Sequence, residues 1–357
     1  MEVKILVINL GSTSTKIAVY NNDKLFLHKE LRHDPAVILK FENSIAQKDF
    51  REEQILNFIS ENNYDLSNID IFVGRGGLIK PVEGGTYLIN EKMIRDLTSM
   101  HYGDHVSNLG SIIAYDFAKK HNKKAYTVNP VVVDELSDLA KVSGFNGINR
   151  KSIFHALNHK AVANKYAKKV NKNYQDLNLI VSHMGGGISI SLHKKGKVVD
   201  VNNALGGEGP FSVERAGTLP VFGIIDFWHE NPNLTKEDLK RLLVTKGGIF
   251  SYLGTASGFQ IAKRVLAGDK QAEFYIDAML YQVNKNIGAL YFAAKGEIDA
   301  VIFTGGLVYQ QYLREKIQNL LIPNLNVVFY PGEDELQALA EGVLRVLNKE
   351  EEAKEYK

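Results

Sequence analysis

Two kinds of hydrophobic pattern alternate along the chain. Short runs rich in valine, isoleucine, phenylalanine and tyrosine predict β-strands at 3–8, 16–20, 24–31, 69–73, 125–128, 179–183, 188–193, 198–201, 300–304 and 327–330. Longer segments with apolar residues every three or four positions predict helices at 111–121, 151–170, 235–243, 271–294 and 335–347. The alternation of strands with helices indicates an α/β fold.

Length and local signals suggest how the chain is divided. A chain of 357 residues with 45% hydrophobic content suits two packed lobes. We expect one lobe at 1–148, completed by 335–357, and a second at 149–334, with the crossing near 145–150. The charged tail 348–357 is expected to be frayed. Thr235 and Asp238 have the spacing of a helix cap and predict that a helix begins there. The predicted helix at 271–294 carries more apolar residues than one face needs, so we expect it to form a contact between lobes or subunits, with burial in the intrachain core as the alternative.

Composition excludes several classes of function. The 43 basic and 41 acidic residues are interspersed, so no stripe for nucleic acid is present and we expect no nucleic-acid partner. The absence of cysteine excludes disulfides, thiolate metal sites and a cysteine nucleophile, and it favours a reducing compartment or a heat-exposed source. No signal-peptide pattern and no apolar run near the roughly 20 residues of a membrane span occur. We therefore expect a cytoplasmic protein that does not enter a membrane.

A polar turn between two predicted strands is the first candidate site. The segment "VINLGSTSTKIAVY" at 7–20 places Gly11 and the hydroxyl residues 12–15, which include Ser12 and Ser14, before a strand that begins at Lys16. Glycine allows a tight turn, and hydroxyls together with backbone N–H groups can converge on an anion. Phosphate is the ligand that this turn favours, and a polar hairpin without a ligand is the alternative.

The same plan recurs in the second half of the chain. The segment "LIVSHMGGGISISLHKKGKVVDV" at 179–201 has a strand, His183, the glycines Gly185, Gly186 and Gly187, and two further strands. A third segment, "AVIFTGGLVYQQYLREKI" at 300–317, has a strand that ends at Gly305 and Gly306 before a helical pattern. Two glycine-rich hairpins and one strand-to-helix glycine pair together indicate a site for a nucleotide polyphosphate.

Arginine and histidine positions add candidate chemistry. Arg75 and Arg215 lie beside glycines in predicted loops, where a planar guanidinium can bind a carboxylate or a phosphoryl group with two hydrogen bonds. Other arginines, Arg51 among them, lie in charged or helical stretches and are predicted to be solvated. His155 and His159 are four residues apart on a helical pattern, but no glutamate completes an H-E-x-x-H zinc motif.

Several motifs together resemble a known family. The order of "NLGSTSTK", "HMGGGIS" and "FTGGL" resembles the phosphate-1, phosphate-2 and adenosine motifs of the superfamily of acetate kinase, sugar kinases, the heat-shock chaperone ATPase and actin. The segments "VGRGG", "SMH", "VVVDE", "SIFHALNH", "EGPFSVERAG" and "PGEDELQALAEG" resemble the acetokinase family. The forms "GRGG", "SHMGGGIS" and "GEGPFS" are similar to its butyrate kinases more than to its acetate kinases. The resemblance runs from residue 5 to about residue 346.

The resemblance implies a fold and a reaction. The fold would be two-lobed and actin-like, with duplicated ribonuclease H-like domains and a nucleotide cleft between the lobes. The reaction would be reversible transfer of a phosphoryl group from ATP to butyrate or a short branched acid, giving an acyl phosphate and ADP. The alternatives are an acetate or propionate kinase, and a nucleotide-gated binding module without catalysis. The resemblance also suggests a homodimer or a higher homo-oligomer.

The resemblance also implies roles for individual residues. Arg75, Asp134, His155 and Arg215 would be catalytic, and His101 and Phe154 would line the acid pocket. The nucleotide phosphates would lie on Gly11, Ser12, Ser14, Lys16, His183, Gly185, Gly186 and Gly187, and the nucleoside on Gly305 and Gly306. Mg²⁺ would be held by Asn9 and by Glu333 or Asp334, with Glu335 left open as a third choice.

Overall fold

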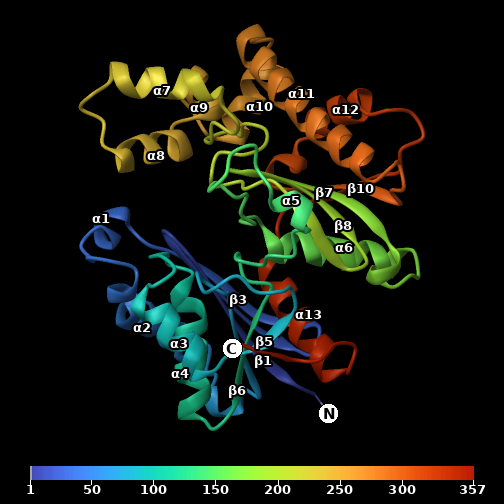
Figure 1. Ribbon diagram of the computed structural model, residues 1–357. Coiled ribbons are helices and arrows are strands. Elements are labelled where there is room, and N and C mark those ends of the chain that lie inside the picture. Colours follow the sequence, from blue (N-terminus) through green and yellow to red (C-terminus); the bar gives the residue numbers. More distant parts are fainter. Residues whose placement is uncertain (1) are drawn as a thin grey trace. The chain divides into compact units, whose positions relative to one another are not determined.

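The computed structural model describes residues 2–357, and within this range the strands form two sheets, each in its own compact unit (Figure 1). The first unit contains the chain up to Val133 together with Asp334–Lys357, and the second contains Asp134–Glu333. Both units combine a sheet with helices, so the α/β architecture expected from the sequence is confirmed.

The first unit is built on one mixed sheet. Its strands are β1 Lys4–Gly11, β2 Ser14–Asn21, β3 Lys24–Arg32, β4 Ile71–Gly74, β5 Thr86–Leu88, β6 Lys124–Val128 and β12 Lys354–Glu355, in the order β12-β5-β6-β4-β1-β2-β3. Its helices are α1 Pro35–Ile38, α2 Lys48–Glu61, α3 Glu91–Ser99, α4 Asn108–Lys120 and α13 Glu335–Leu347, with 3₁₀ turns η1 Ile45–Gln47 and η2 Leu66–Asn68. Strands β1 to β3 are antiparallel, whereas β4 runs parallel to β1 and β6 parallel to β4.

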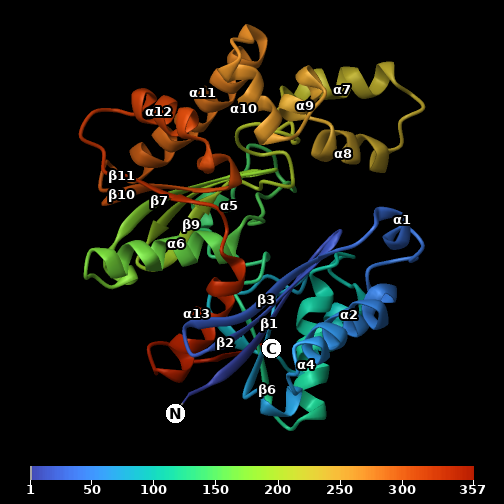
Figure 2. The same ribbon diagram turned by 180° about the vertical axis from the view of Figure 1, so that it is seen from behind.

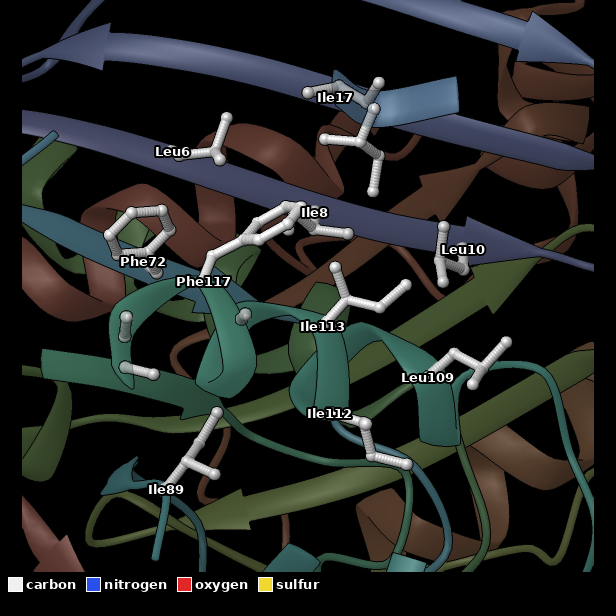
Figure 3. Packing of buried hydrophobic residues seen from close by; sticks show 14 of the residues in the cluster. Leu6, Ile8, Leu10, Ile17, Phe72, Ile89, Leu109, Ile112, Ile113 and Phe117 are labelled. Carbon is white, nitrogen blue, oxygen red and sulfur yellow. The ribbon is translucent and has the colours of Figure 1, made fainter. Parts of the chain in front are cut away.

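Strand β1 is buried, and its run of apolar residues packs against the helices α4 and α13, which both come later in the chain. Leu6, Ile8 and Leu10 belong to one core cluster with residues of α4 such as Ile113 and Phe117 (Figure 3). Helix α13, which comes from the C-terminal end of the chain, also packs on β1. A central strand in this setting is fixed in position, and so is the polar turn that follows it.

The C-terminal tail is ordered, so the expectation that 348–357 is frayed was wrong. Lys354–Glu355 forms strand β12, parallel to β5. The Tyr356 side chain is buried, and its hydroxyl donates to Asp96 Oδ2 at 2.6 Å and accepts from Lys80 N at 3.2 Å. The buried aromatic ring, its paired hydroxyl and the strand pairing together order a tail that the sequence shows as charged.

The second unit repeats the plan of the first. Its strands are β7 Asn178–Met184, β8 Ile188–Lys194, β9 Lys197–Val201, β10 Ala300–Gly305 and β11 Val327–Pro331, in the order β11-β10-β7-β8-β9. Its helices are α5 Asp138–Lys141, α6 Ala156–Lys169, α7 Val221–Glu230, α8 Lys236–Thr245, α9 Gly248–Leu253, α10 Gly258–Leu266, α11 Lys270–Ala293 and α12 Gln311–Leu320, with 3₁₀ turns η3 Tyr174–Asp176 and η4 Gly306–Tyr309.

The two sheets share a topology. Strands β7, β8 and β9 form antiparallel hairpins like β1, β2 and β3, and β10 runs parallel to β7 as β4 does to β1. Figure 2 shows β11, β10 and β7 side by side. The repeat of "strand, polar turn, strand, strand" recognised in the sequence is therefore a repeat of the fold.

The long helix α11 has apolar residues on more than one face. Ile276, Met279 and Val283 are buried in the core of the second unit, whereas Phe274 and Phe292 are exposed. The lobe or subunit contact expected at this helix stays a prediction, and so does the homo-oligomer that the family resemblance suggests. Across residues 2–357, the helices are either too short or too polar to cross a lipid bilayer.

Candidate active site

The β1–β2 hairpin has the geometry expected of an anion-binding turn. Gly11 pairs with Ser14 and Asn9 pairs with Lys16 across the two strands. Ser12 lies at the exposed tip of the turn. The predicted hairpin is confirmed, and its contact with phosphate stays a prediction.

Arg51 lies beneath this turn, and the prediction that it is a solvated surface residue was wrong. Its side chain is fully buried and donates to three hairpin carbonyls, those of Gly11 at 3.3 Å, Ser12 at 3.0 Å and Ser14 at 2.8 Å. It also donates to Thr15 Oγ1 at 2.9 Å. Burial lowers the pKa of Arg51 to about 10.

These contacts orient the turn. A trans peptide points its C=O and the following N–H in opposite directions. Because the carbonyls of Gly11 and Ser12 point at Arg51, the N–H groups of Ser12 and Thr13 point away from it. The turn therefore presents outward-facing donors above a buried positive charge, which is an arrangement that binds anions.

Arg75, Asn9 and Glu335 form a polar cluster at the ends of β4, β1 and the start of α13. Arg75 Nη1 lies 2.7 Å from Oε1 and 2.9 Å from Oε2 of Glu335, and 3.3 Å from Asn9 Oδ1. Asn9 Nδ2 donates to Glu335 Oε2 at 2.6 Å. The structure thus brings together the predicted arginine, the predicted asparagine and the third of the carboxylates that the sequence left open.

The other two carboxylates have different partners. Asp334 caps α13 by accepting from Gln337 N at 3.1 Å, and Glu333 lies 3.1 Å from His183 Nε2 in the second unit. Glu335 is therefore the carboxylate of the three that contacts Asn9.

Asn9 and Glu335 suit a magnesium ion that is shared with substrate phosphates and water better than a metal ion held by protein ligands alone. Among the described residues 2–357, no group of three or more histidine, aspartate or glutamate side chains is arranged to hold a metal ion. Mg²⁺ prefers oxygen ligands and is usually held by one or two carboxylates, waters and substrate phosphates. The amide oxygen of Asn9 and the carboxylate of Glu335 are a donor set of that kind.

In the second unit, Arg215 lies against the glycine turn between β7 and β8. A β-carbon on Gly187 would overlap Arg215 Nη1 and Cζ, so only glycine leaves room for the guanidinium. The turn is closed by Gly185 N donating to Gly187 O at 3.0 Å, and Ser212 Oγ donates to Gly186 O while accepting from Arg215 N at 3.0 Å.

The Arg215 guanidinium itself is only partly satisfied. Nη1 donates to Ala204 O at 3.1 Å, and Nε is buried with no hydrogen-bond partner among the residues that the structure describes. Burial lowers the pKa of Arg215, although Glu214 acts in the opposite direction. A buried guanidinium with an unused donor has capacity to bind an anion.

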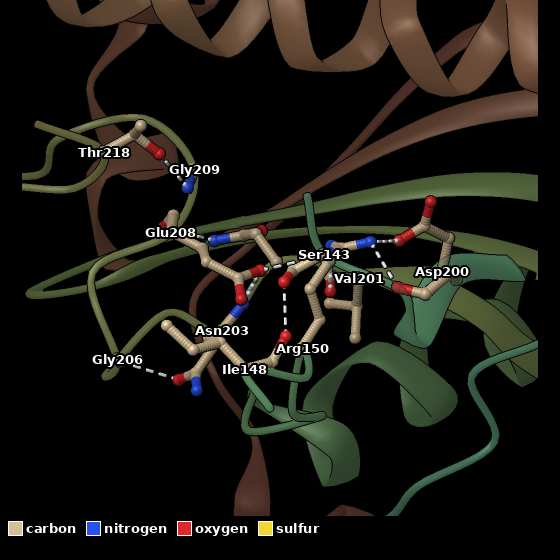
Figure 4. Close-up of polar contacts among 12 residues, drawn as sticks. Ser143, Ile148, Arg150, Asp200, Val201, Asn203, Gly206, Glu208, Gly209 and Thr218 are labelled. Carbon is tan, nitrogen blue, oxygen red and sulfur yellow. Dashed lines mark hydrogen bonds and ion pairs between the residues drawn. The ribbon is translucent and has the colours of Figure 1, made fainter. Parts of the chain in front are cut away.

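The loop that carries Arg215 is held in place by Arg150, which the sequence analysis missed. Arg150 pairs with Asp200 at 2.9 Å and with Glu208 at 3.2 Å, and it donates to Val201 O at 3.0 Å (Figure 4). Asn203 Oδ1 accepts from Gly206 N at 2.6 Å in the same loop. The sequence around residue 150 gives no indication of this role, because the acidic partners Asp200 and Glu208 lie 50 and 58 positions later in the chain.

An apolar pocket of about 420 Å³ opens beside Arg215. Its walls come from Ile153 before α6, from the loop 204–207 and 215–217, and from Leu243 and Val244 of α8. Lys240 and Arg215 are its charged lining residues among those described. The pocket thus combines hydrocarbon walls with cationic groups, all within the second unit.

His155 lies at the N-terminus of α6, held by β8 and stacked on His183. Its Nδ1 lies 2.8 Å from Ser189 Oγ, and the His155 and His183 rings stack with centroids 3.7 Å apart. His183 Nδ1 contacts Asn158 Oδ1 at 2.9 Å. The helix predicted at 151–170 begins at Ala156, because the carbonyl of Ile153 accepts from Ala204 N and so is used outside the helix.

The third glycine motif ends β10. Gly305 has φ of +95°, and a β-carbon there would overlap the backbone of Met184 on the neighbouring β7, so glycine is required for the strands to meet. A β-carbon on Gly306 would meet nothing within 4 Å, and Gly306 is exposed. The strand and the following helical turn confirm the predicted context, while nucleoside binding stays a prediction.

Three further predicted residues each have contacts within their own unit. Asp134 pairs with Lys141 at 3.4 Å and accepts from Leu136 N at 3.2 Å. His101 is exposed in the first unit, with its ring edge on Tyr102, whereas Phe154 is buried in the second unit against His159. Their roles in acid binding stay predictions.

Comparison with known proteins gives one family and one fold. The family model described as the acetokinase family matches residues 144–328. The structure of acetate kinase from Porphyromonas gingivalis is similar at a TM-score of 0.73 and 20% identity, covering 97% of this chain and 100% of that chain. A propionate kinase from Francisella tularensis subsp. tularensis SCHU S4 matches at a TM-score of 0.71 and 19% identity, covering 95% and 98% of the two chains. Acetate kinase from Entamoeba histolytica matches at a TM-score of 0.71 and 18% identity, with the same coverage. At these identities the structural likeness establishes the fold alone, and it confirms the expected actin-like α/β class.

Proposed function

The chain belongs to the acetokinase family, and from this premise we propose that it transfers the γ-phosphoryl group of ATP to butyrate or a short branched acid such as isobutyrate. A carboxylate oxygen forms a bond to the γ-phosphorus while the bond from that phosphorus to ADP breaks, and the bonding electrons leave with ADP. The products are an acyl phosphate and ADP, and the reaction is reversible. The carboxylate is already ionised near neutral pH, so no general base is needed.

The observation that carries this proposal is the contact of Arg215 with the glycine turn at Gly187, on the wall of an apolar pocket. Transfer between two anions requires cationic groups that hold donor and acceptor in line and stabilise charge on the equatorial oxygens. The unpartnered Nε of Arg215 is a donor for that charge.

The first unit supplies the corresponding groups of its own. The Arg51-backed turn at Ser12 and Ser14 offers phosphate donors, with Lys16 on the returning strand. Arg75 is proposed as the second guanidinium, and Asn9 and Glu335 as the residues that would hold Mg²⁺ or its waters. Bound magnesium would neutralise charge on the phosphates.

His155 and Asp134 have supporting roles in this proposal. His155 would donate a hydrogen bond to the transferring phosphoryl group, and Asp134 would position the acid or the magnesium. His183 and Gly185 border the β7–β8 turn that we propose for phosphate binding, and Gly306 leaves open space where a nucleoside can approach the backbone.

The size of the pocket supports an acid longer than acetate. Acetate has one methyl group, whereas the walls formed by Ile153, Leu243 and Val244 offer apolar contact to a longer or branched chain. Burial of each further methylene stabilises the complex by about 0.8 kcal/mol. The acetate and propionate kinases among the structural relatives keep a two- or three-carbon acid as the second candidate.

A hydroxylamine trap for acyl phosphate tests the proposal. Acetate, propionate, butyrate and isobutyrate are each incubated with ATP and Mg²⁺, and kcat/KM is measured from the acyl hydroxamate formed. We expect the highest value for butyrate or isobutyrate. A maximum at acetate or propionate overturns the acid assignment but keeps the kinase. If the protein binds nucleotide but forms no hydroxamate from any acid, both the acid assignment and the kinase activity are overturned, and a nucleotide-binding module without catalysis remains.

A further inference from the structure

A continuous line of hydrogen bonds runs through the interior of the second unit and reaches His155. The links are His155 Nδ1 to Ser189 Oγ at 2.8 Å, Ser189 Oγ to His159 Nε2 at 2.8 Å, His159 Nδ1 to Ser191 Oγ at 2.7 Å, Ser191 Oγ to His193 Nε2 at 2.7 Å, and His193 Nδ1 to Tyr174 Oη at 2.6 Å. The inner members are fully or almost fully buried. We call these six side chains the histidine–serine chain.

Chemistry allows two directions for this chain. Burial lowers the pKa of His159 and His193 well below the ordinary value, so both rings are neutral and each has one N–H and one free lone pair. Each serine has one hydroxyl proton. When a ring nitrogen on one side of a serine donates to it, the serine donates to the ring on its other side unless a better acceptor is near, so one end then sets the direction of every link.

Tyr174 fixes that end. Burial raises its pKa well above the ordinary value, and therefore the hydroxyl keeps its proton. Within residues 2–357 its hydroxyl has one hydrogen-bond partner, His193 Nδ1. A buried donor left without an acceptor costs about 1–3 kcal/mol, so Tyr174 donates to His193.

In the competing arrangement, Ser191 accepts from the rings on both sides and the direction of the hydrogen bonds reverses there. Ser191 could donate instead to Val181 O, but that oxygen lies at 3.5 Å, whereas the two imidazole nitrogens lie at 2.7 Å. Hydrogen bonds from a hydroxyl are usually 2.5–3.0 Å long. The serine proton therefore goes to His159, and the direction set at Tyr174 continues to His155.

We infer that Tyr174, acting through Ser191 and Ser189, holds His155 as the neutral tautomer whose Nδ1 accepts and whose Nε2 carries the proton. Tyr174 is thus a positioning residue about five hydrogen bonds away from the group it orients. If the proposed function is right, His155 presents an N–H donor for the phosphoryl oxygens without having to become charged. Protonation of Nδ1 would either reverse every link, which leaves the Tyr174 proton without an acceptor, or make one serine accept from both rings, which leaves that serine proton without a ring acceptor.

Nuclear magnetic resonance of the whole protein with ¹⁵N-labelled histidine tests this directly. Protonated and unprotonated imidazole nitrogens have well-separated ¹⁵N shifts, and single His→Gln variants assign the three rings. We expect Nε2–H at His155, His159 and His193. Nδ1–H at His155 or at His159 in the unmodified protein overturns the inference, and this readout does not depend on kinase activity.

Tyr174→Phe tests the source of the direction. We expect a second set of signals with Nδ1–H at His155 and His159, together with a several-fold lower kcat and an unchanged KM for ATP. Tyr166→Phe is the matched control, because Tyr166 is buried in the same cluster but bonds Asn326 instead of the chain. Unchanged tautomers in Tyr174→Phe would show that Tyr174 does not set the direction. A tautomer change without any change in kcat would support the direction inferred for the histidine–serine chain and would count against the proposed role of His155.

Discussion

The guanidinium of Arg215 lies directly against the backbone of Gly187, so closely that a β-carbon at this glycine would overlap Nη1. Gly187→Ala should therefore displace Arg215 without changing any charged group. Since Gly187 has no positive φ, the new methyl group acts by contact alone. We expect kcat to fall on the order of 10²-fold, as when one donor to a developing charge is lost.

A helical glycine provides the control for this substitution. A β-carbon on Gly288 in α11 meets nothing within 4 Å. Gly288→Ala should leave kcat unchanged and raise the free energy of unfolding by about 0.5–1 kcal/mol, measured by urea denaturation. Normal turnover in Gly187→Ala would argue that the position of Arg215 does not matter.

Arg215→Lys separates charge from geometry. Lysine keeps the positive charge but loses the planar pair of donors, so turnover should fall by on the order of 10²- to 10³-fold while ATP affinity changes little. Arg75→Lys should behave similarly, with a larger rise in the KM of the acid if Arg75 binds the carboxylate. Steady-state kinetics and direct ATP binding measure both effects. Near-normal turnover in Arg215→Lys would remove its catalytic role.

Arg51→Lys should destabilise the β1–β2 turn, whose carbonyls Arg51 binds. Two nitrogens of Arg51 donate to four hairpin oxygens, whereas lysine has three N–H donors on a single nitrogen and cannot satisfy all four. We therefore expect a fall of about 2 kcal/mol or more in the free energy of unfolding. The KM for ATP should rise by about tenfold or more, since the turn loses its orientation. Arg95→Lys, at an exposed position of α3, is the control and should change neither quantity. Unchanged ATP kinetics in Arg51→Lys would show that the turn does not bind phosphate.

Val244→Phe tests which acid the apolar pocket takes. Val244 lies in the wall of the pocket, so a phenyl ring there should exclude a longer chain before it excludes acetate. The ratio of kcat/KM for butyrate to that for acetate should fall by about tenfold or more. Val142→Phe, at an exposed position outside the pocket, should leave the ratio as it was. A constant ratio in Val244→Phe would place the acid elsewhere.

The buried histidines predict a loss of stability in mild acid. His159 and His193 have lowered pKa values in the folded protein, whereas in the unfolded chain they take up protons near pH 6.5. The unfolded state therefore binds more protons below that pH, and the free energy of unfolding should fall by about 1.4 kcal/mol per pH unit for each histidine. Urea denaturation between pH 7 and pH 5 measures the slope. His193→Gln should reduce this slope by the contribution of one histidine, and an unchanged slope would contradict the prediction.

The sequence determined the parts of the fold that depend on local pattern. The apolar run of β1, the turn at Gly11 and the paired repeat at Gly185 are read from alternation and glycine alone, because strand and hairpin preferences act over a few residues. The capped start of α8 is likewise local: Thr235 accepts from Asp238 N at 3.1 Å, as its spacing predicts. The resemblance of these ordered motifs also gave the family.

Tertiary structure decided the partners that lie far apart in the chain. Arg51 lies among charged residues of α2, and only the packing of that helix turns it onto carbonyls 37 to 40 positions earlier. The choice of Glu335 over Glu333 follows from where α13 begins against β1, and the order of the tail follows from a pocket for Tyr356. Local sequence determines which backbone conformations are favourable. A long polar side chain such as that of Arg51, however, binds buried carbonyl groups that lack other hydrogen-bond partners, and these are brought near it by tertiary packing. Such groups exist only once the units have folded.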